Sequence, residues 1–317
     1  MRQLKAALKS LAGSNAARRN QRQARAVHAT PLNGLGALIR RAPSEGADDS
    51  PVFIFSAGWR SGSTLLQRMV CSDHTTLMWG EPYDLCEIIQ TLARIPRPVT
   101  QDWPPEAYFL RDHDPDRLTH NWIANLYPAL PDLRDALRAT LCRLFEQPAL
   151  ASGAVRWGLK EVRFGLEEAT FLHWLYPNAK FLMIHRNVED AFRSYQNFSP
   201  AMDWYGRWPF APASTPFAFA RHRQHILSQF PDIAKLTGGM IVSYEDLIRK
   251  PAQADRIAQY CGIEIAPQIL DRRVQGRQAA TVLTDKRLSR LDKVLLCAGT
   301  SFANRRFSRH DPQGPRR

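Results

Sequence analysis

The chain has 317 residues with a formal net charge of +13, and 44% of its residues are hydrophobic and 10% aromatic. This length and apolar content are enough for one sizeable α/β domain or two small ones. The sequence contains no run of about 18 or more apolar residues, so a membrane-spanning helix is not expected.

The positive charge is concentrated in the first part of the chain. Residues 1–43 contain nine Lys and Arg residues and no Asp or Glu, which leaves +4 of the total +13 for the other 274 residues. This segment lacks the apolar stretch of a secretory signal, and it fits a disordered basic arm, a short helix on an acidic surface or a transit-like leader. We expect residues 1–50 to form an arm that either associates with an anionic surface or has no dedicated partner. No aromatic residues are interleaved with these charges, so a specific nucleic-acid partner is not expected.

The cysteines predict neither disulfides nor a metal site. They are odd in number and widely spaced, with no CxxC pair and no Cys/His cluster at zinc-ligand spacing: Cys71, Cys86, Cys142, Cys261 and Cys297. We therefore expect buried, reduced thiols, a cytoplasmic location and no metal cofactor.

Strand and helix patterns alternate from Pro51 onward. Apolar runs predict strands at residues 52–56, 76–79, 154–161 and 180–186, and a strand turning into a helix at 238–247. Helical patterns lie between them at residues 63–71, 83–94, 131–145 and 165–176, and Asn187 is placed to cap a further helix. Residues 96–118 hold five prolines and are expected to form a loop excursion.

This alternation predicts the fold class. We expect a single three-layer α/β domain over residues 51–300, with a mostly parallel sheet of about five strands and helices on both faces. The strand runs are apolar without strict alternation, as is typical of strands that are covered on both faces. A basic tail is expected at residues 301–317.

The loop between the first strand and the first helix is predicted to bind an anion. Gly58 and Gly62 permit a tight turn, and Arg60 carries a permanent charge with a geometry suited to phosphate or sulfate. Backbone N–H groups at the helix start are further donors, as are three hydroxyl groups: Ser61, Ser63 and Thr64. A nucleoside-triphosphate loop has a lysine directly after its second glycine, whereas Ser63 follows Gly62 here. An ordinary strand-to-helix turn is the alternative.

Three segments, in this order, resemble the sulfotransferase family, whose members use 3′-phosphoadenosine 5′-phosphosulfate (PAPS). WRSGSTLL at 59–66 is similar to the family's loop for the 5′-phosphosulfate. KFLMIHRNVEDAFRSY at 180–195 supplies Arg186 and, eight positions later, Ser194, as in the family's 3′-phosphate element. IVSYEDLIRKP at 241–251 resembles a third, looser element. The layout is most similar to the tyrosylprotein, carbohydrate-acting and bacterial branches.

The resemblance implies a P-loop-like fold, PAPS as co-substrate, 3′,5′-adenosine bisphosphate as product, and no metal. It also implies eight nucleotide-binding residues: Arg60, Ser61, Gly62, Ser63, Thr64, Arg186, Ser194 and Tyr244. Geometry agrees for the two arginines, because ligands in open parallel sheets bind beyond the carboxyl ends of strands. A cation at a helix start is unfavourable unless an anion lies nearby, which favours a ligand role for Arg186.

The resemblance further implies the groups that act on the acceptor. In the tyrosylprotein and carbohydrate-acting branches a glutamate after the first loop serves as base, and Glu81 lies at a similar place. Lys160 corresponds to a lysine that faces the transferred group, and with Arg60 it is expected to stabilise the leaving group. Three alternatives stay open: Glu81 as an ordinary loop residue, Lys160 in a salt bridge with Glu161 or Glu167, and a histidine base among His74, His113, His173 and His185.

Two features depart from the family pattern or leave the acceptor open. Phe198 stands where tyrosylprotein relatives carry another basic contact, and the nucleotide lid has only vague counterparts: Arg272, Arg273, Arg277 and Lys286. The aromatic residues at 198–210 and the loop at 96–118 are candidates for the acceptor rim or for plain packing.

The prediction is a PAPS-dependent sulfotransferase that transfers the sulfuryl group by in-line displacement to a hydroxyl or amine of an acceptor, such as a carbohydrate, peptide or small metabolite. One alternative is a catalytically silent nucleotide-binding protein of the same fold. A P-loop kinase is less favoured because the lysine is missing. Neither the acceptor nor the oligomeric state follows from the sequence.

Overall fold

The computed structural model describes residues 50–83, 86–120, 123–196, 215–266 and 287–307, together with residues 269, 273–274 and 277–278. The basic segment 1–49, the aromatic segment 198–210, and Arg272 and Lys286 of the predicted lid lie outside these ranges, as do the side chains of Arg273 and Arg277. None of the helices in the described ranges is long and apolar enough to span a bilayer.

The fold is built around a sheet of five parallel strands. In their order across the sheet they are β2 (Thr76–Gly80), β3 (Arg156–Glu161), β1 (Val52–Ser56), β4 (Lys180–His185) and β5 (Met240–Ser243). β1 lies at the centre, with Phe53 opposite Leu159 on one side and Phe181 on the other. All five carboxyl ends therefore lie at one edge of the sheet, and the predicted parallel sheet is confirmed.

The helices follow the strands along the chain. They are α3 (Ser63–Val70), α4 (Ile88–Arg94), α5 (Pro115–His120), α6 (Leu130–Leu141), α7 (Gln147–Ala151), α8 (Leu166–Leu175), α9 (Val188–Gln196), α10 (Pro216–Leu227), α11 (Phe230–Thr237), α12 (Tyr244–Arg249), α13 (Pro251–Cys261) and α14 (Arg290–Phe307). The described residues also form a 3-10 turn η2 (Glu106–Tyr108), a π-helical turn η3 (Cys142–Glu146) and a short antiparallel pair, β6 (Arg273–Val274) with β7 (Arg277–Gln278).

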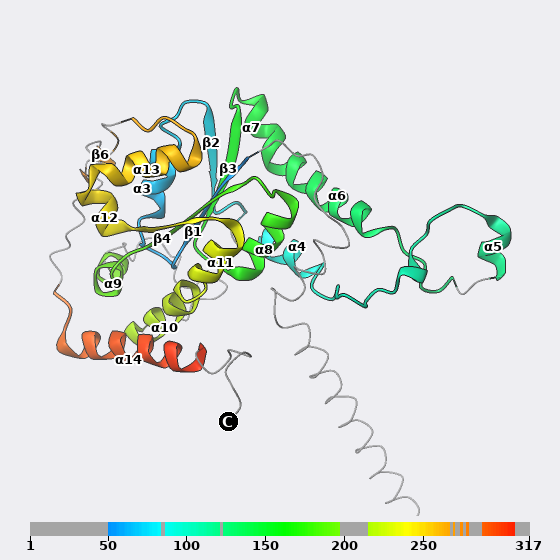
Figure 1. Ribbon diagram of the computed structural model, residues 1–317. Coiled ribbons are helices and arrows are strands. Elements are labelled where there is room, and N and C mark those ends of the chain that lie inside the picture. The colour runs from blue at the N-terminus through cyan, green and yellow to red at the C-terminus, as the bar shows by residue number, and fades with distance from the viewer. Residues whose placement is uncertain are drawn as a thin grey trace, which may run out of the picture.

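Helices cover both faces of the sheet, which gives the predicted three layers (Figure 1). On one face α3, α12 and α13 bury residues such as Leu66, Leu247 and Ile257 against the strands. On the other face α4, α6, α8 and α11 pack around Phe53 and Phe181. A smaller apolar cluster joins α9, α10 and α14, and it places α10 next to the carboxyl ends of β1 and β4.

Two helices differ from their predicted bounds for identifiable reasons. The helix predicted at 83–94 begins only at Ile88, because Tyr83 and Glu87 adopt left-handed backbone conformations, with φ of 56° and 46°. The helix predicted at 131–145 changes to the π-helical turn η3 after Leu141. Pro148 lacks an N–H and its ring would clash with the carbonyl four residues earlier, so regular α-helical bonding cannot pass this point.

The excursion and the tail contain more helix than the sequence suggested. The segment between α4 and α6 carries η2 and α5 and extends away from the sheet in Figure 1. Helix α14 ends at Phe307, so it crosses residue 300, where we expected the domain to end and a tail to begin.

Candidate active site

The predicted anion loop joins β1 to α3 at the carboxyl edge of the sheet. Its backbone turns through three left-handed residues, Gly58 (φ 79°), Arg60 (φ 63°) and Gly62 (φ 94°). No side chain caps the first turn of α3, and that turn holds no acidic residue. The first N–H groups of this helix therefore face the loop together with the positive end of the helix dipole. Such an arrangement is suited to an anion.

The hydroxyl groups of this loop do not all face the same way. Ser61 is fully buried, and its Oγ lies 3.1 Å from the carbonyl oxygen of Ala57 and 2.9 Å from that of Gly58. The same Oγ accepts a hydrogen bond of 2.6 Å from Arg223 Nη1. The Ser61 hydroxyl is therefore engaged within the protein, and the group of Ser61 that can bind an anion is its backbone N–H. Ser63 is buried at the start of α3, whereas Thr64 is exposed.

The first loop and the second predicted element meet directly. Arg60 Nε donates a hydrogen bond of 3.0 Å to Ser194 Oγ, although 134 positions separate the two residues in the sequence. Ser194 lies buried in the last turns of α9. That helix begins after Asn187, whose Oδ1 accepts from the N–H groups of Glu189 (2.9 Å) and Asp190 (3.3 Å), so the predicted cap is confirmed. The residues predicted for the two ends of the nucleotide thus belong to one site.

Arg186 and Tyr244 form the other side of this site. Arg186 directly follows β4, and its guanidinium carbon lies 4.4 Å from the centroid of the Tyr244 ring, a cation–π distance. The Nε atom of Arg186 is buried and has no hydrogen-bond partner among the described residues. Tyr244 is buried at the start of α12, and a Cβ placed on Gly62 would lie 2.2 Å from its ring. Only a glycine at position 62 leaves room for this ring. The Tyr244 ring therefore lies between the first loop and Arg186.

Glu81 and Lys160 form an ion pair at the ends of β2 and β3. The register of the two strands sets Gly80 opposite Lys160, and the N–H of Glu81 continues the ladder with a 2.7 Å bond to the carbonyl of Lys160. The positive φ of Glu81 (35°) then turns its side chain back towards the Lys160 ammonium. The Lys160 side chain is 7% exposed and that of Glu81 is 23% exposed, so the carboxylate is the member of the pair that solvent reaches more easily.

The alternative partners considered for Lys160 are engaged elsewhere. Glu161 is buried and pairs with Arg163, with a 2.6 Å contact between Oε2 and Nη2. Burial raises the pKa of Glu161, against the opposing effect of Arg163. Glu167 pairs with Arg97 on the surface. The salt bridge of Lys160 with Glu161 or Glu167 is therefore wrong, and its partner is Glu81.

A profile of the sulfotransferase family matches residues 51–267, which is more than half of the chain. The chain belongs to the sulfotransferase family. Among solved structures, it is similar to a sulfotransferase domain of the Synechococcus PCC 7002 olefin synthase, at 17% identity over 82% of this chain and 97% of that one, with a TM-score of 0.39. A sulfotransferase domain from the curacin biosynthetic pathway gives 15% identity over 80% and 98%, with a TM-score of 0.42.

A third solved structure, the sulfotransferase STF9 from Mycobacterium avium, gives 14% identity over 90% of this chain and 76% of that one, with a TM-score of 0.34. No curated protein sequence matches the chain.

The histidines of this sulfotransferase that were considered as bases lie in different places. His185 ends β4, and burial lowers its pKa. His173 lies on α8 with its ring centroid 6.2 Å from that of Phe181, and burial lowers its pKa as well. His74 and His113 are exposed. Glu81 is paired with Lys160 at the end of a strand. None of these four histidines forms an ion pair within the described part of the chain.

The sequence prediction missed two residues of α10 that lie against the first loop. Arg223 is 3% exposed and donates to the carbonyl of Ala57 (2.8 Å) as well as to Ser61. His222 stacks on Trp59 with the ring centroids 5.2 Å apart. A signal was available: the buried face of α10 is formed by Phe219, Ala220, Arg223 and Ile226, so an arginine occurs in an apolar stripe of helical period.

The acid stability of this sulfotransferase is expected to depend on His222. Burial lowers its pKa from 6.5 to about 4, so the unfolded chain takes up this proton at higher pH than the folded protein does. The free energy of unfolding therefore falls as the pH drops from about 6.5 towards 4, and His222 accounts for a loss of about 3 kcal/mol.

We expect His222→Phe, which keeps the stack on Trp59, to flatten this acid limb in urea unfolding measured between pH 4 and 7. His173 and His185 should leave a residual slope, because burial lowers their pKa values too. The same change at the exposed His113 serves as the control. An unchanged slope in His222→Phe would contradict this assignment.

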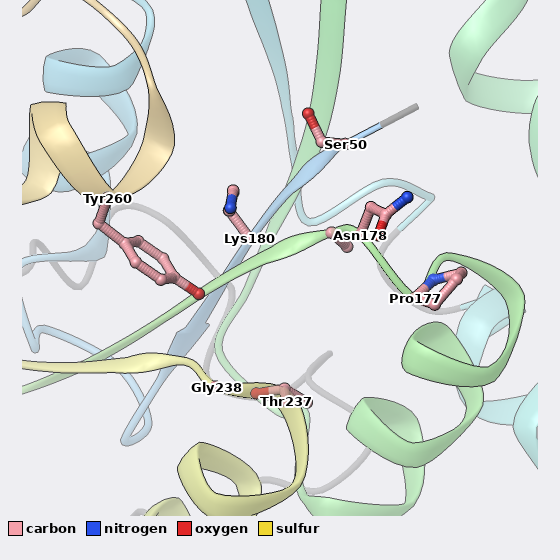
Figure 2. Close-up of a pocket in the computed structure, with 8 residues that line it drawn as sticks. Ser50, Pro177, Asn178, Lys180, Thr237, Gly238 and Tyr260 are labelled. Atoms are coloured by element: carbon pink, nitrogen blue, oxygen red, sulfur yellow. The ribbon is translucent and has the colours of Figure 1, made fainter. Parts of the chain in front are cut away.

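A separate hollow of about 410 Å³ lies at the opposite edge of the sheet, where the strands begin (Figure 2). Lys180 at the start of β4 points into it, with its Nζ 5.4 Å from the centroid of the Tyr260 ring. Lys180 is the first of the six residues of β4 and Arg186 directly follows the last, so the two residues lie roughly 20 Å apart along the strand. This hollow is therefore distinct from the site at the carboxyl edge.

Proposed function

We propose that this sulfotransferase transfers a sulfuryl group from PAPS to a hydroxyl or amine of an acceptor by in-line displacement, with Glu81 as the base. The observation that carries the proposal is the hydrogen bond between Arg60 and Ser194. It joins two anion-binding elements at the same edge of the sheet as the Glu81–Lys160 pair. The acceptor classes proposed are carbohydrates, peptides and small metabolites.

The residues present fit a nucleotide with phosphates at both ends. The first loop offers an uncapped helix start without acidic residues, which suits the 5′ end. Arg186 offers a buried Nε that lacks a partner among the described residues, which suits the 3′-phosphate. We assign Arg60, Ser61, Gly62, Ser63 and Thr64 to the 5′ end, and Arg186, Ser194 and Tyr244 to the 3′ end.

In this proposal the Glu81–Lys160 pair accepts the proton of the acceptor and stabilises the negative charge that develops on the leaving phosphate. When bound, PAPS supplies the sulfuryl group and an adenosine bisphosphate leaving group. Glu81 takes the proton of the acceptor hydroxyl, and this neutralises the carboxylate that holds the Lys160 ammonium. The ammonium is then available, with Arg60 and the loop amides, to the oxygen of the leaving phosphate. Arg186 and Ser194 hold the far end of the nucleotide and so fix its orientation.

Thermal unfolding with two nucleotides tests this proposal against the two alternatives. We expect 3′,5′-adenosine bisphosphate to stabilise the protein by about 2.7 kcal/mol at a hundred times its dissociation constant, and we expect ATP with magnesium to have less effect. Stabilisation by ATP and magnesium alone would favour a kinase and overturn the proposal. Stabilisation by the bisphosphate in a protein that transfers sulfate to none of a panel of hydroxyl and amine acceptors would favour a silent nucleotide-binding protein.

A further inference from the structure

Arg223 forms hydrogen bonds to both proposed anion-binding elements, the first loop and the segment that begins at Arg186. Its Nη1 donates to the Ala57 carbonyl (2.8 Å) and to Ser61 Oγ (2.6 Å), both in the first loop. Its Nη2 donates to the carbonyl of Arg186 in the second element. One side chain from α10 therefore bonds to backbone or side-chain oxygens on both sides of the site.

The guanidinium group is suited to setting a distance. Its donors lie in a rigid plane, so two acceptors bonded to different nitrogens are held at a fixed separation. Ala57 and Ser61 occupy one nitrogen and Arg186 the other. Helix α10, which carries Arg223, is itself held by the apolar cluster with α9 and α14, so the backbone from which this side chain extends is firmly packed.

The positive charge of Arg223 has no direct ion pair with a carboxylate in the described part of the chain, although Glu245 lies near enough to interact with it. No ion pair within the described part of the chain involves Arg223, whose side chain is almost wholly buried. Burial lowers its pKa to about 9, against the opposing effect of the Glu245 carboxylate, and the nearby Arg186 lowers it further. Retaining a buried cation of this kind for packing alone is unfavourable, which favours a role in the adjoining site.

We propose that Arg223 is a positioning residue that sets the separation of the first loop from Arg186, so that a nucleotide with phosphates at both ends can span them. This inference rests on the proposed function. A ligand that spans two sites gains affinity because the second contact is intramolecular, and that gain is lost when the spacing is wrong. A ligand with one phosphate occupies one element only and is insensitive to the spacing.

The test compares three nucleotides in the full-length protein with Arg223→Lys, which keeps the charge but not the fork. We expect the Kd for 3′,5′-adenosine bisphosphate to rise by about tenfold or more, and the Kd values for adenosine 5′- and 3′-monophosphate to change by less than about threefold. Titration calorimetry measures all three. The matched control is Arg221→Lys on the exposed side of the same helix, for which no change is expected.

Two further variants keep the test informative if Arg223→Lys folds poorly. Ser61→Ala removes one acceptor of the fork and should show the same pattern with a smaller loss. In Arg223→Ala, added guanidinium ion should restore the affinity for the bisphosphate, because it can replace the missing planar donor group.

Equal losses for all three nucleotides, or no loss in Arg223→Lys, would overturn the inference and leave the proposed function intact. Failure of the parent protein to bind the bisphosphate would overturn both.

Discussion

Glu81→Gln is expected to lower kcat by about 10²- to 10⁴-fold, the usual contribution of a general base. Glutamine keeps the shape of the side chain but cannot accept the acceptor's proton. The Kd for 3′,5′-adenosine bisphosphate should stay nearly unchanged, because Glu81 contacts Lys160 and lies outside the two anion-binding elements. Transfer of labelled sulfate from PAPS to an acceptor found by screening, together with calorimetry, measures the two quantities.

The control for this variant is Glu87→Gln. Glu87 lies six positions after Glu81, at the N-cap of α4, and its only ion pair among the described residues is a 3.8 Å contact with Arg94, so the change removes a carboxylate that forms no ion pair with Lys160. Its activity should match that of the parent protein. If Glu81→Gln instead weakens nucleotide binding as much as it lowers kcat, Glu81 is part of the nucleotide site and another group is the base.

Arg186→Ala is expected to have the opposite profile. The change removes the buried Nε donor and the cation that lies over Tyr244. A hydrogen bond between charged groups contributes about 1.5–3 kcal/mol, which corresponds to a rise in the Kd for 3′,5′-adenosine bisphosphate of about 10- to 150-fold. At saturating PAPS the loss in kcat should be much smaller than in Glu81→Gln, because in the proposed mechanism Arg186 holds the end of the nucleotide that does not react.

Two substitutions separate the ligand role of Arg186 from its packing role. Arg186→Lys keeps the charge but loses the planar group, so we expect an intermediate Kd. Arg249→Ala removes an exposed arginine at the end of α12 and controls for the loss of one positive charge. A bisphosphate affinity in Arg186→Ala equal to that of Arg249→Ala would show that Arg186 does not bind the nucleotide.

The sheet and most of its helices could be predicted because the apolar runs are long and the caps are local. Asn187 illustrates this, since its capping role depends only on the residues that follow it. The sequence also indicated Glu81 and Lys160, but not that they pair, because their contact depends on the register of β2 against β3. Register is a tertiary property that neither strand carries alone.

Arg223 could not be assigned a role from local pattern. Its acceptor Ser61 lies 162 positions away, and no motif links α10 to the first loop. The arginine in the buried stripe of α10 was a visible irregularity, yet its meaning depends on how α10 packs. The same holds for the Tyr244 ring, whose position against Gly62 requires that β5 be placed at the edge of the sheet.

The central position of β1 also constrains how the protein is made. β1 ends at Ser56, yet its two neighbours begin at Arg156 and Lys180. At a synthesis rate of about 5–20 residues per second, the chain grows for roughly 5–20 s before the first neighbour exists. During that interval a strand that is fully buried in the finished protein has neither of its pairing partners. The proposed nucleotide-binding residues Arg186 and Ser194 are made later still, so before β3 and β4 exist β1 can pack only against the part of the chain already made, which includes α3.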